Sequence, residues 1–371
     1  MRIVQIVRVG EKMGGIAQVA RQYHFLAQKS CELNESSSLI TLVDCPLETF
    51  LKHFADIGAI HAAGLTKGWR QFSPRAIRLY SNILFSTDLV IAHTGTCMPV
   101  LRIITALNTK RKIPLVGIVH NDNSLRRAHR YDGMICLTSE QAKRLSDVVK
   151  AKQLAVIPNP LGAGDFPDDL FEGKIFRISP YRANVGVMCN LVPKKNVSRL
   201  LDEFACVLSL NGSQAVWHMH IAGDGPEKLA LKQKARELGI ESYVSFHGWI
   251  DAKERAEFFD SIDILWHAAT LEPFGLVMVE AAYYGCHVQA IESAGSCAIS
   301  AEDRIPELEV INADARLGDF ASAALARLEN HKERRDRLIA ARRNAINNYS
   351  IQALAQEWHE QMKKFADGDF L

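Results

Sequence analysis

The stretch Glu272-Pro-Phe-Gly-Leu-Val-Met-Val-Glu280 follows an apolar run, Ile262–Trp266, that is typical of a buried strand. From Leu276 onward the pattern predicts a helix, closed by Gly285. The start of such a helix carries unpaired N–H groups and a positive partial charge, which favour anions such as a diphosphate. The two carboxylates around it can accept hydrogen bonds from hydroxyl groups. The stretch therefore predicts an α/β fold with a nucleotide-sugar site.

Each carboxylate also has an ordinary explanation when it is taken alone. Glu272 would then cap the helix, and Glu280 would be a solvated surface charge. The choice depends on what the rest of the chain contains.

Length and composition indicate a globular protein of about two domains, because 371 residues exceed one ordinary core. No apolar run reaches the roughly 18 residues of a membrane span. The first residues, Met1–Val7, have the pattern of a buried strand and not of a signal peptide. The eight cysteines are scattered without a C-x-x-C spacing, which argues against a zinc site or disulfide framework. We therefore expect a cytoplasmic protein.

Charge is distributed unevenly along the chain. Residues 1–150 carry a balance of +9 and the remainder a balance of −7, within a net charge of +2. A basic first half suggests an anionic contact. No aromatic and basic RNA-binding signature is present, so nucleic acid is not expected. An anionic membrane surface fits better, and we expect peripheral contact with the inner face of the cell membrane.

Strand and helix patterns alternate, which predicts parallel sheets with helices on both faces. We expect a first Rossmann-like domain over residues 1–160, with the helix of about 350–371 packed back on it, and a second over 180–345. Ligands are expected at the carboxyl ends of the strands, in a cleft. The strands are predicted at Arg2–Val7, Ser38–Val43, Leu89–His93, Leu115–Val119, Met134–Thr138, Asn184–Cys189, His218–Ala222, Val244–Phe246, Ile262–Trp266 and Val288–Ile291. The main helices are predicted at Ala17–Gln28, Ser139–Val149, Val197–Leu210, Pro226–Leu238, Lys253–Ser261 and Leu276–Tyr284, with a helical tail from Leu317 to Phe365.

Several motifs in fixed order resemble the retaining glycosyltransferases of family 4, which have the GT-B fold. The opening stretch resembles the family's E-G-F-G-L-x-x-x-E-A pattern, with Pro273 at a small residue's place and His287 where Pro is usual. Further matches are Val156-Ile-Pro-Asn159, Ile221-Ala-Gly-Asp-Gly-Pro-Glu227 and Val244-Ser-Phe-His-Gly-Trp249. Singly these are weak, but their order and spacing make an unrelated fold improbable. The resemblance covers nearly the whole chain and is strongest from Val185 to Val288.

The segment Leu191-Val-Pro-Lys-Lys195 resembles the family's R-L-V-P-E-K-G, whose Arg and Lys neutralise the donor diphosphate. Lys195 matches the Lys, whereas Asn190 stands at the place of the Arg and Asn196 at the place of the Gly. Lys194, at the position of the usual Glu, is a candidate for replacing the missing charge. With Asn190 at the place of the Arg, the motif itself leaves one charge of the diphosphate unpaired.

In the first half, Met13-Gly-Gly-Ile16 follows the first strand without the G-x-G-x-x-G of a dinucleotide site. The glycines either make a tight turn or allow close approach to the donor phosphates or the acceptor, as the resemblance implies. His120 directly follows the predicted strand Leu115–Val119, and His93 ends the predicted strand Leu89–His93. A lone histidine is more often structural, but this place favours a functional role. In the family a histidine at the position of His120 contacts the transferred sugar, and His93 is assigned to the acceptor.

The resemblance implies a retaining glycosyltransferase that moves a sugar from a nucleotide-diphospho-sugar to a glycan or lipid-linked acceptor in cell-surface polysaccharide, lipopolysaccharide or glycolipid synthesis. The alternatives are a GT-B sugar-nucleotide epimerase and an inactive nucleotide-sugar-binding homologue, the latter motivated by Asn190. No cofactor or metal is expected, because Lys195 supplies charge and no D-x-D motif is apparent. The expected catalytic residues are Glu272, His120 and Lys195; the donor-binding residues are Gly15, Asn190, Lys195, Gly223, Gly248, Phe274, Gly275, Leu276, Val277 and Glu280; and the acceptor-binding residues are Gly14 and His93.

The segment from Trp69 to Tyr80 mixes aromatic and apolar residues with Arg70, Arg75 and Arg78. This pattern is typical of a helix at a membrane interface. It is equally typical of an ordinary surface helix with a core stripe.

Overall fold

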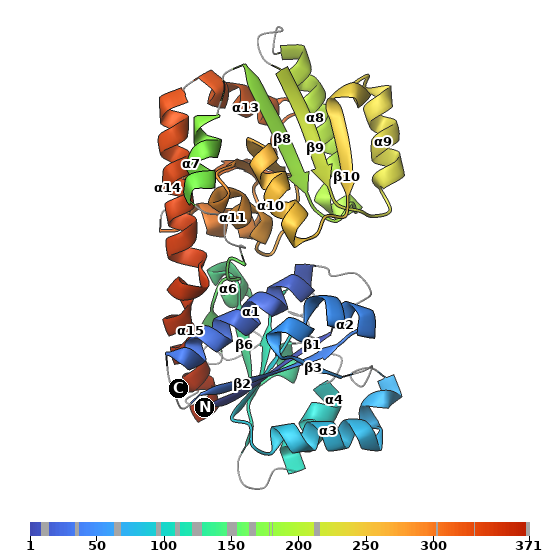
Figure 1. The fold of residues 1–371 in the computed structure, drawn as a ribbon, viewed down its shortest axis with the longest axis vertical. Helices are drawn as coiled ribbons and strands as arrows, with labels where there is room; N and C mark the ends of the chain where they lie inside the picture. Colours follow the sequence, from blue (N-terminus) through green and yellow to red (C-terminus); the bar gives the residue numbers. More distant parts are fainter. Residues whose placement is uncertain are drawn as a thin grey trace. The chain divides into compact units, whose positions relative to one another are not determined.

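The computed structural model of the protein describes residues 1–8, 15–33, 37–62, 68–93, 98–107, 112–120, 128–146, 154–162, 168–177, 179, 181–210, 216–301, 303–329 and 331–368. The chain divides into two compact units. Unit 1 is Met1–Gly162 with Tyr349–Leu371, and unit 2 is Ala163–Asn348. Both units are α/β, with a parallel sheet between helices (Figure 1).

Unit 1 contains a seven-stranded parallel sheet in the order β3-β2-β1-β4-β5-β6-β7. Its buried strands are rich in Val, Ile and Leu, as expected for a sheet covered on both faces. The strands are β1 (Arg2–Arg8), β2 (Ser38–Asp44), β3 (Ile60–His61), β4 (Leu89–Ala92), β5 (Leu115–Ile118), β6 (Gly133–Cys136) and β7 (Leu154–Val156). The helices are α1 (Gly15–Glu32), α2 (Leu47–His53), α3 (Pro74–Leu84), α4 (Met98–Leu107), α6 (Ser139–Ser146) and α15 (Ile351–Asp367).

Helices α3 and α4 pack on one face of this sheet, where Tyr80 and Leu84 meet strand residues such as Val4 and Val90. Helix α1 supplies Ala20 to a second cluster that also holds residues of β1, β2 and α2. Helix α15 lies along α1 (Figure 1). The end of the chain is therefore part of the first unit.

Unit 2 contains a six-stranded parallel sheet in the order β10-β9-β8-β11-β12-β13. Its strands are β8 (Arg182–Met188), β9 (Val216–Ala222), β10 (Val244–Gly248), β11 (Ile264–His267), β12 (His287–Ile291) and β13 (Glu309–Ile311). Its helices are α7 (Asp168–Phe176), α8 (Val197–Leu210), α9 (Lys228–Glu237), α10 (Ala252–Ser261), α11 (Leu276–Tyr283), α12 (Ala294–Ser300), α13 (Asp319–Glu329) and α14 (His331–Tyr349). A 3-10 turn, η5 (Pro193–Lys195), precedes α8.

Helices α8, α9 and α13 bury Phe204, Leu231 and Phe320 against one face of the sheet, together with Trp217 and Trp266 from the strands. Helices α10 and α11 lie on the other side (Figure 1). This arrangement leaves the loops at the carboxyl ends of the strands as the places where side chains can meet a ligand.

The helical tail predicted as continuous is in fact three helices. Ser350 interrupts it, and its side chain accepts a hydrogen bond from the backbone N–H of Ala353 at the start of α15. Tyr80, predicted within an amphipathic membrane-facing or core-facing segment, is fully buried in the core of unit 1. In the described part of the chain, no helix combines the length and apolar character needed to cross a bilayer.

Candidate active site

The strand order of unit 2 reverses between β8 and β11. The chain runs outward from β8 to β9 and β10, and then returns to place β11 on the other side of β8. The loops that leave the carboxyl ends of β8 and β11 therefore start side by side and diverge, which is where α/β sheets bind ligands. Residues 189–196 follow β8, and residues 268–275 follow β11.

Lys195 from the first loop and Glu272 from the second form an ion pair at this point. The same carboxylate oxygen, Oε2 of Glu272, lies 3.1 Å from Nε2 of His267, the last residue of β11. All three side chains are largely buried. The structure thus brings together two of the three residues predicted as catalytic, and adds a histidine.

The carboxyl group of Glu272 is held in its charged form. Burial alone would raise the pKa, but the hydrogen bond and charge of His267 and the charge of Lys195 outweigh burial and lower the pKa of Glu272 to about 2. Both contacts use Oε2, and no described residue binds Oε1, so Oε1 can accept a hydrogen bond from a hydroxyl group. A charged, prearranged acceptor next to a lysine suits a ligand with both hydroxyl and anionic groups.

The loop that carries Glu272 is fixed by two glycines. Gly275, the residue before α11, has φ 81°, and a Cβ there would lie 2.2 Å from Cε of Met278 and 3.1 Å from Cγ of Glu272. Gly295 in α12 donates its backbone N–H to the carbonyl of Glu272 at 2.9 Å. A Cβ at Gly295 would lie 2.3 Å from the carbonyl oxygen of Phe274. Glycine is needed at both positions for the loop to sit this closely.

Glu280, predicted to bind the donor, lies in α11 with 3% of its surface exposed. Its Oε1 accepts a hydrogen bond of 2.8 Å from Arg255 in α10. The Nε of Arg255 is buried without a hydrogen-bond partner among the described residues. Glu280 is therefore part of a buried ion pair and not the solvated surface charge of the ordinary explanation.

The glycines of the loop after β9 allow this loop to pack closely against the loop after β8. Gly223 has φ 135°, and a Cβ there would lie 1.8 Å from the carbonyl oxygen of Cys189. The backbone N–H of Gly223 donates to the carbonyl of Gly248 at 2.7 Å. Gly225 would likewise place a Cβ 2.3 Å from the carbonyl oxygen of Leu191. Gly223, predicted to bind the donor, and Gly225, which was not predicted, therefore both pack against the loop that carries Lys195.

Asn190 and Asn196 depart from the family pattern in different ways. Asn196 has φ 52°, a left-handed conformation that glycine adopts freely and asparagine tolerates best among other residues. The backbone thus explains why Asn can replace Gly there. Asn190 is exposed, and its side chain has no hydrogen bond to any residue that the structure describes. Nothing in the structure explains the loss of Arg at this position.

The first turn of α11 supplies the remaining predicted donor contacts. Leu276 and Val277 are partly exposed, whereas the side chain of Phe274 is buried. Helix α11 starts without a side-chain cap on its N–H groups. Because the first N–H groups of a helix have no partner within it, this turn can bind an anion.

In unit 1, His93 follows β4 and His120 follows β5. Strands β4 and β5 are neighbours, so the two carboxyl ends adjoin. The Nδ1 atom of His93 lies 3.0 Å from Nε2 of His120, and the rings stack. Burial lowers the pKa of His120 to about 4, and burial followed by the charge of His120 lowers the pKa of His93 well below its ordinary value. The structure brings these two predicted residues together as a neutral pair.

Two further site residues were predicted in unit 1, Gly14 and Gly15. Gly14 lies outside the described residues, and Gly15 is the first residue of α1. Sequence reasoning did not include His267 and Arg255. His267 is the last residue of β11, just as His93 ends its predicted strand, and this position at the carboxyl end of a strand is a signal that could have revealed it. Arg255 lies 25 residues before its partner Glu280, and no local pattern links them.

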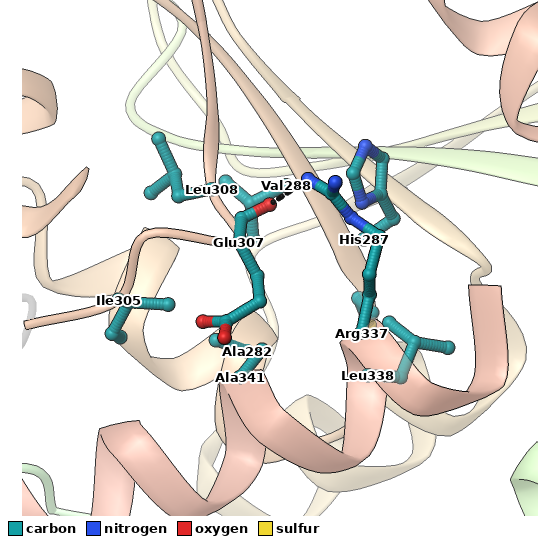
Figure 2. Close-up of a pocket in the computed structure, with 10 residues that line it drawn as sticks. Ala282, His287, Val288, Ile305, Glu307, Leu308, Arg337, Leu338 and Ala341 are labelled. Atoms are coloured by element: carbon teal, nitrogen blue, oxygen red, sulfur yellow. Dashed lines mark hydrogen bonds between the residues drawn. The ribbon is translucent and has the colours of Figure 1, made fainter. Parts of the chain in front are cut away.

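Two pockets of unit 2 lie elsewhere. Figure 2 shows a small one of about 10 Å³ between α11, β12 and α14, where Arg337 donates a 3.1 Å hydrogen bond to the carbonyl of Glu307. It has room for about one water molecule. His287, at the family's Pro position, lines it and lies 3.1 Å from Glu309 in a structural network. A second pocket, of about 590 Å³, lies between α7 and α14, and no predicted site residue lines it. Among the described residues, no three His, Cys, Asp or Glu side chains are grouped so that they could hold a metal ion.

Comparison with known proteins gives one family and several relatives. Residues 177–345 match the family model described as "Glycosyl transferases group 1". The chain is 29% identical over 171 residues to the alpha-monoglucosyldiacylglycerol synthase of Streptococcus pneumoniae, a segment that covers 44% of this chain and 38% of that protein. It is 26% identical over 174 residues to the lipopolysaccharide core biosynthesis glycosyltransferase LpsE of Rhizobium meliloti, covering 44% and 45%. The matches thus span less than half of these relatives' lengths.

Among solved structures, Anabaena Alr3699/HepE in complex with UDP and glucose is similar with a TM-score of 0.74 and 19% identity, over 98% of this chain and 100% of that one. A glycosyltransferase from Rickettsia africae is similar with a TM-score of 0.71 and 14% identity, over 98% of each chain. This likeness, with the two parallel sheets, confirms the predicted fold class: GT-B, with two doubly wound Rossmann-like domains.

Proposed function

Because residues 177–345 match the family model described as "Glycosyl transferases group 1", we propose that the chain is a glycosyltransferase that uses a nucleotide-diphospho-sugar. The observation that carries this proposal is the Lys195–Glu272–His267 cluster at the switch point of unit 2. The Lys195 ammonium group of this cluster can bind a phosphate, and the Glu272 carboxylate beside it can accept hydrogen bonds from sugar hydroxyl groups. Helix α11 begins shortly after Glu272, and its first turn has no side-chain cap.

The donor would be held by charge and by backbone N–H groups. Lys195 has three N–H donors, so it can contact a diphosphate oxygen while it remains paired with Glu272. The N–H groups of the first turn of α11 would take a second phosphate oxygen. Oε1 of Glu272 would accept a hydrogen bond from a sugar hydroxyl. Glu280, which is held in place by its ion pair with Arg255, would accept a hydrogen bond from a ribose hydroxyl.

Transfer would retain the configuration at the sugar carbon. In the proposed front-face step, the acceptor hydroxyl oxygen bonds to the anomeric carbon as the bond from that carbon to the diphosphate breaks. The acceptor proton passes to the leaving diphosphate oxygen. Lys195 and the helix start would stabilise the developing charge on the diphosphate. The fixed cation makes a metal unnecessary, so we propose that transfer is metal-independent.

The acceptor is assigned to unit 1, with Gly14 and His93 as its residues, whereas the resemblance assigns Gly15 to the nucleotide-sugar and His120 to the transferred sugar. The named relatives include enzymes of glycolipid and lipopolysaccharide synthesis, which supports a cell-surface glycan or lipid-linked acceptor. We propose peripheral attachment to an anionic membrane, supported by the +9 balance of residues 1–150.

An inactive nucleotide-sugar-binding homologue is the second candidate. The observation that favours it is Asn190, exposed and without a hydrogen bond to the described residues, where the family has a phosphate-binding Arg. Such a protein would bind a nucleotide sugar but transfer nothing.

Two linked measurements test the proposal. A thermal-shift screen of UDP-, GDP-, ADP- and CMP-sugars should single out one donor, because a bound ligand stabilises the fold by mass action. UDP-sugars come first, since a similar structure holds UDP and glucose. Transfer is then assayed with that donor and a panel of glycan and glycolipid acceptors, and NMR of the product gives its anomeric configuration. Donor binding without transfer across the panel would favour the inactive homologue, turnover without any acceptor would favour an epimerase, and an inverted product would overturn retention.

A further inference from the structure

In the histidine pair of unit 1, one ring nitrogen is buried without a hydrogen-bond partner among the described residues. His93 is 6% exposed, and its Nε2 is buried without a partner among the described residues. The ring of Tyr23 in α1 packs edge-on against His93 at 5.4 Å between centroids, and Trp358 in α15 packs on Tyr23 at 5.1 Å. His93 is therefore buried beside aromatic rings.

Only two proton arrangements fit this geometry, since both rings are neutral near pH 7 and their facing nitrogens are 3.0 Å apart. In the first, His93 carries its proton on Nδ1 and donates it to Nε2 of His120. In the second, His120 donates from Nε2, and the proton of His93 is on Nε2.

The buried Nε2 of His93 separates the two arrangements. In the second it would be an N–H group enclosed without an acceptor. In the first it is an unprotonated nitrogen enclosed without a donor. Buried N–H groups without partners are rarer in proteins than acceptors that lack a donor, so the first arrangement is favoured. The proton of His120 is then on Nδ1.

We propose that His93 is a positioning residue that fixes His120 in the tautomer protonated on Nδ1, so that His120 presents an N–H donor to an oxygen of the bound sugar. The effect on sugar transfer rests on the proposed function, whereas the tautomer does not. The neutral N–H group of His120 would bind an uncharged hydroxyl or ring oxygen of the sugar.

The tautomer is measured directly on the full-length protein without substrate. A long-range ¹H–¹⁵N correlation spectrum of the ¹⁵N-labelled chain near pH 7 distinguishes the two ring nitrogens of each histidine. The chain has 13 histidines, so the signals of His120 are assigned by their loss in His120→Gln. We expect protonated Nδ1 and unprotonated Nε2 at His120. The opposite pattern would overturn the proposal.

Two variants of His93 separate positioning from packing. His93→Asn keeps an N–H donor at the same number of bonds from Cα as Nδ1, but it loses ring volume. His93→Phe keeps the ring against Tyr23 and loses the donor. We expect His93→Asn to retain the tautomer of His120 and His93→Phe to release it into a mixture.

Turnover should follow the same order. Loss of one hydrogen bond of ordinary strength corresponds to a fall in kcat of about tenfold in His93→Phe, with KM for the donor changed less, while His93→Asn should fall by only about threefold. If Phe preserves activity better than Asn, His93 acts through packing and the proposal is wrong.

The experiment keeps the two proposals apart. If no donor and acceptor give turnover with the wild-type protein, the proposed function fails, and the spectra alone decide the tautomer. If His93→Phe does not fold, the wild-type and His93→Asn spectra decide it. An unchanged tautomer of His120 in folded His93→Phe would overturn the role of His93.

Discussion

Lys195 and Glu272 lie 77 residues apart in the chain, and their side chains form an ion pair. The pair follows from the topology, because β8 and β11 are neighbours while the chain between them forms β9 and β10. His267 binds the same carboxylate oxygen from the end of β11. The fold thus places the two charges before any ligand binds, which is the condition for electrostatic stabilisation of a transition state.

Glu272→Gln and Lys195→Ala should each reduce turnover by about 100-fold or more, because each removes a group that stabilises charge or orients the sugar. The fold should persist, since the core of unit 2 does not depend on either side chain. Steady-state kinetics with the donor found by thermal shift checks this. Lys234→Ala is the matched control: it breaks the ion pair with Asp202 on α8 and should leave turnover near normal. Near-normal transfer in Glu272→Gln or Lys195→Ala would contradict the assignment of that residue to the active site.

Gly275→Ala should lower both stability and turnover. An Ala at φ 81° carries backbone strain of about 1–2 kcal/mol, and its Cβ would press on Cγ of Glu272. Gly239→Ala is the control, because Gly239 has φ 70° and open space around its Cβ position. Both variants should lose comparable stability in denaturant titrations, and only Gly275→Ala should lose turnover beyond that. Equal kinetics in the two variants would mean that the Gly275 loop does not position Glu272.

The low pKa of Glu272 gives a pH dependence with a defined sign. The group titrates near 4.5 when unfolded and at about 2 when folded, so its contribution to stability is present above about pH 4.5 and is lost as the pH falls toward about 2. The difference in free energy of unfolding between wild type and Glu272→Gln should therefore be constant above about pH 5 and shrink below about pH 4.5. Denaturant titrations across this range measure it. A difference that stays constant down to the lowest pH at which the fold persists would show that the carboxylate is not held in its charged form.

Chelation should leave activity intact. Lys195 and the start of α11 provide fixed positive charge for the diphosphate, so no divalent cation is required for the leaving group. Transfer is measured with and without an excess of EDTA. Loss of activity that magnesium or manganese restores would overturn the metal-independent mechanism.

The periodic and motif-bearing parts of the fold could be predicted from the sequence. Helix α8 has the predicted bounds, Val197–Leu210, and each predicted strand matches an observed one to within about two residues. The strands β3, β7 and β13 were missed. They have two or three residues each, too few to show the alternation or apolar run by which a strand is recognised.

The candidate site was predictable where chain connectivity alone brings residues together. The topology of a doubly wound sheet places the loops of Lys195 and Glu272 side by side, as the motifs implied. The pairing of Glu280 with Arg255 was not predictable, because it depends on the packing of α10 against α11. Tyr80 shows the limit of helical periodicity: an amphipathic pattern is the same whether its apolar stripe faces a core or a lipid surface, and here the tyrosine faces the core.

Attachment to anionic vesicles should depend on the basic surface of α3 and the turn before it. Arg70, Arg75 and Arg78 are exposed, and Ile77 beside them is 42% exposed. The protein should sediment with anionic vesicles at low salt and dissociate as salt rises, because the Debye length falls to about 10 Å at 0.1 M. Reversal of all three arginines to Glu should weaken sedimentation, since each basic residue near such a surface contributes about 1 kcal/mol.

The control for this experiment keeps the change in net charge the same. Lys143 in α6 and the pair Lys363 and Lys364 in α15 are also exposed on unit 1, so their reversal to Glu alters the total charge equally. If α3 forms the contact, the arginine triple variant should dissociate at lower salt than the lysine triple variant. Equal effects would mean that the attraction comes from total charge and not from α3. Absence of vesicle binding by the wild-type protein would instead favour a soluble acceptor, and α3 would be an ordinary surface helix whose stripe, with Tyr80, serves the core.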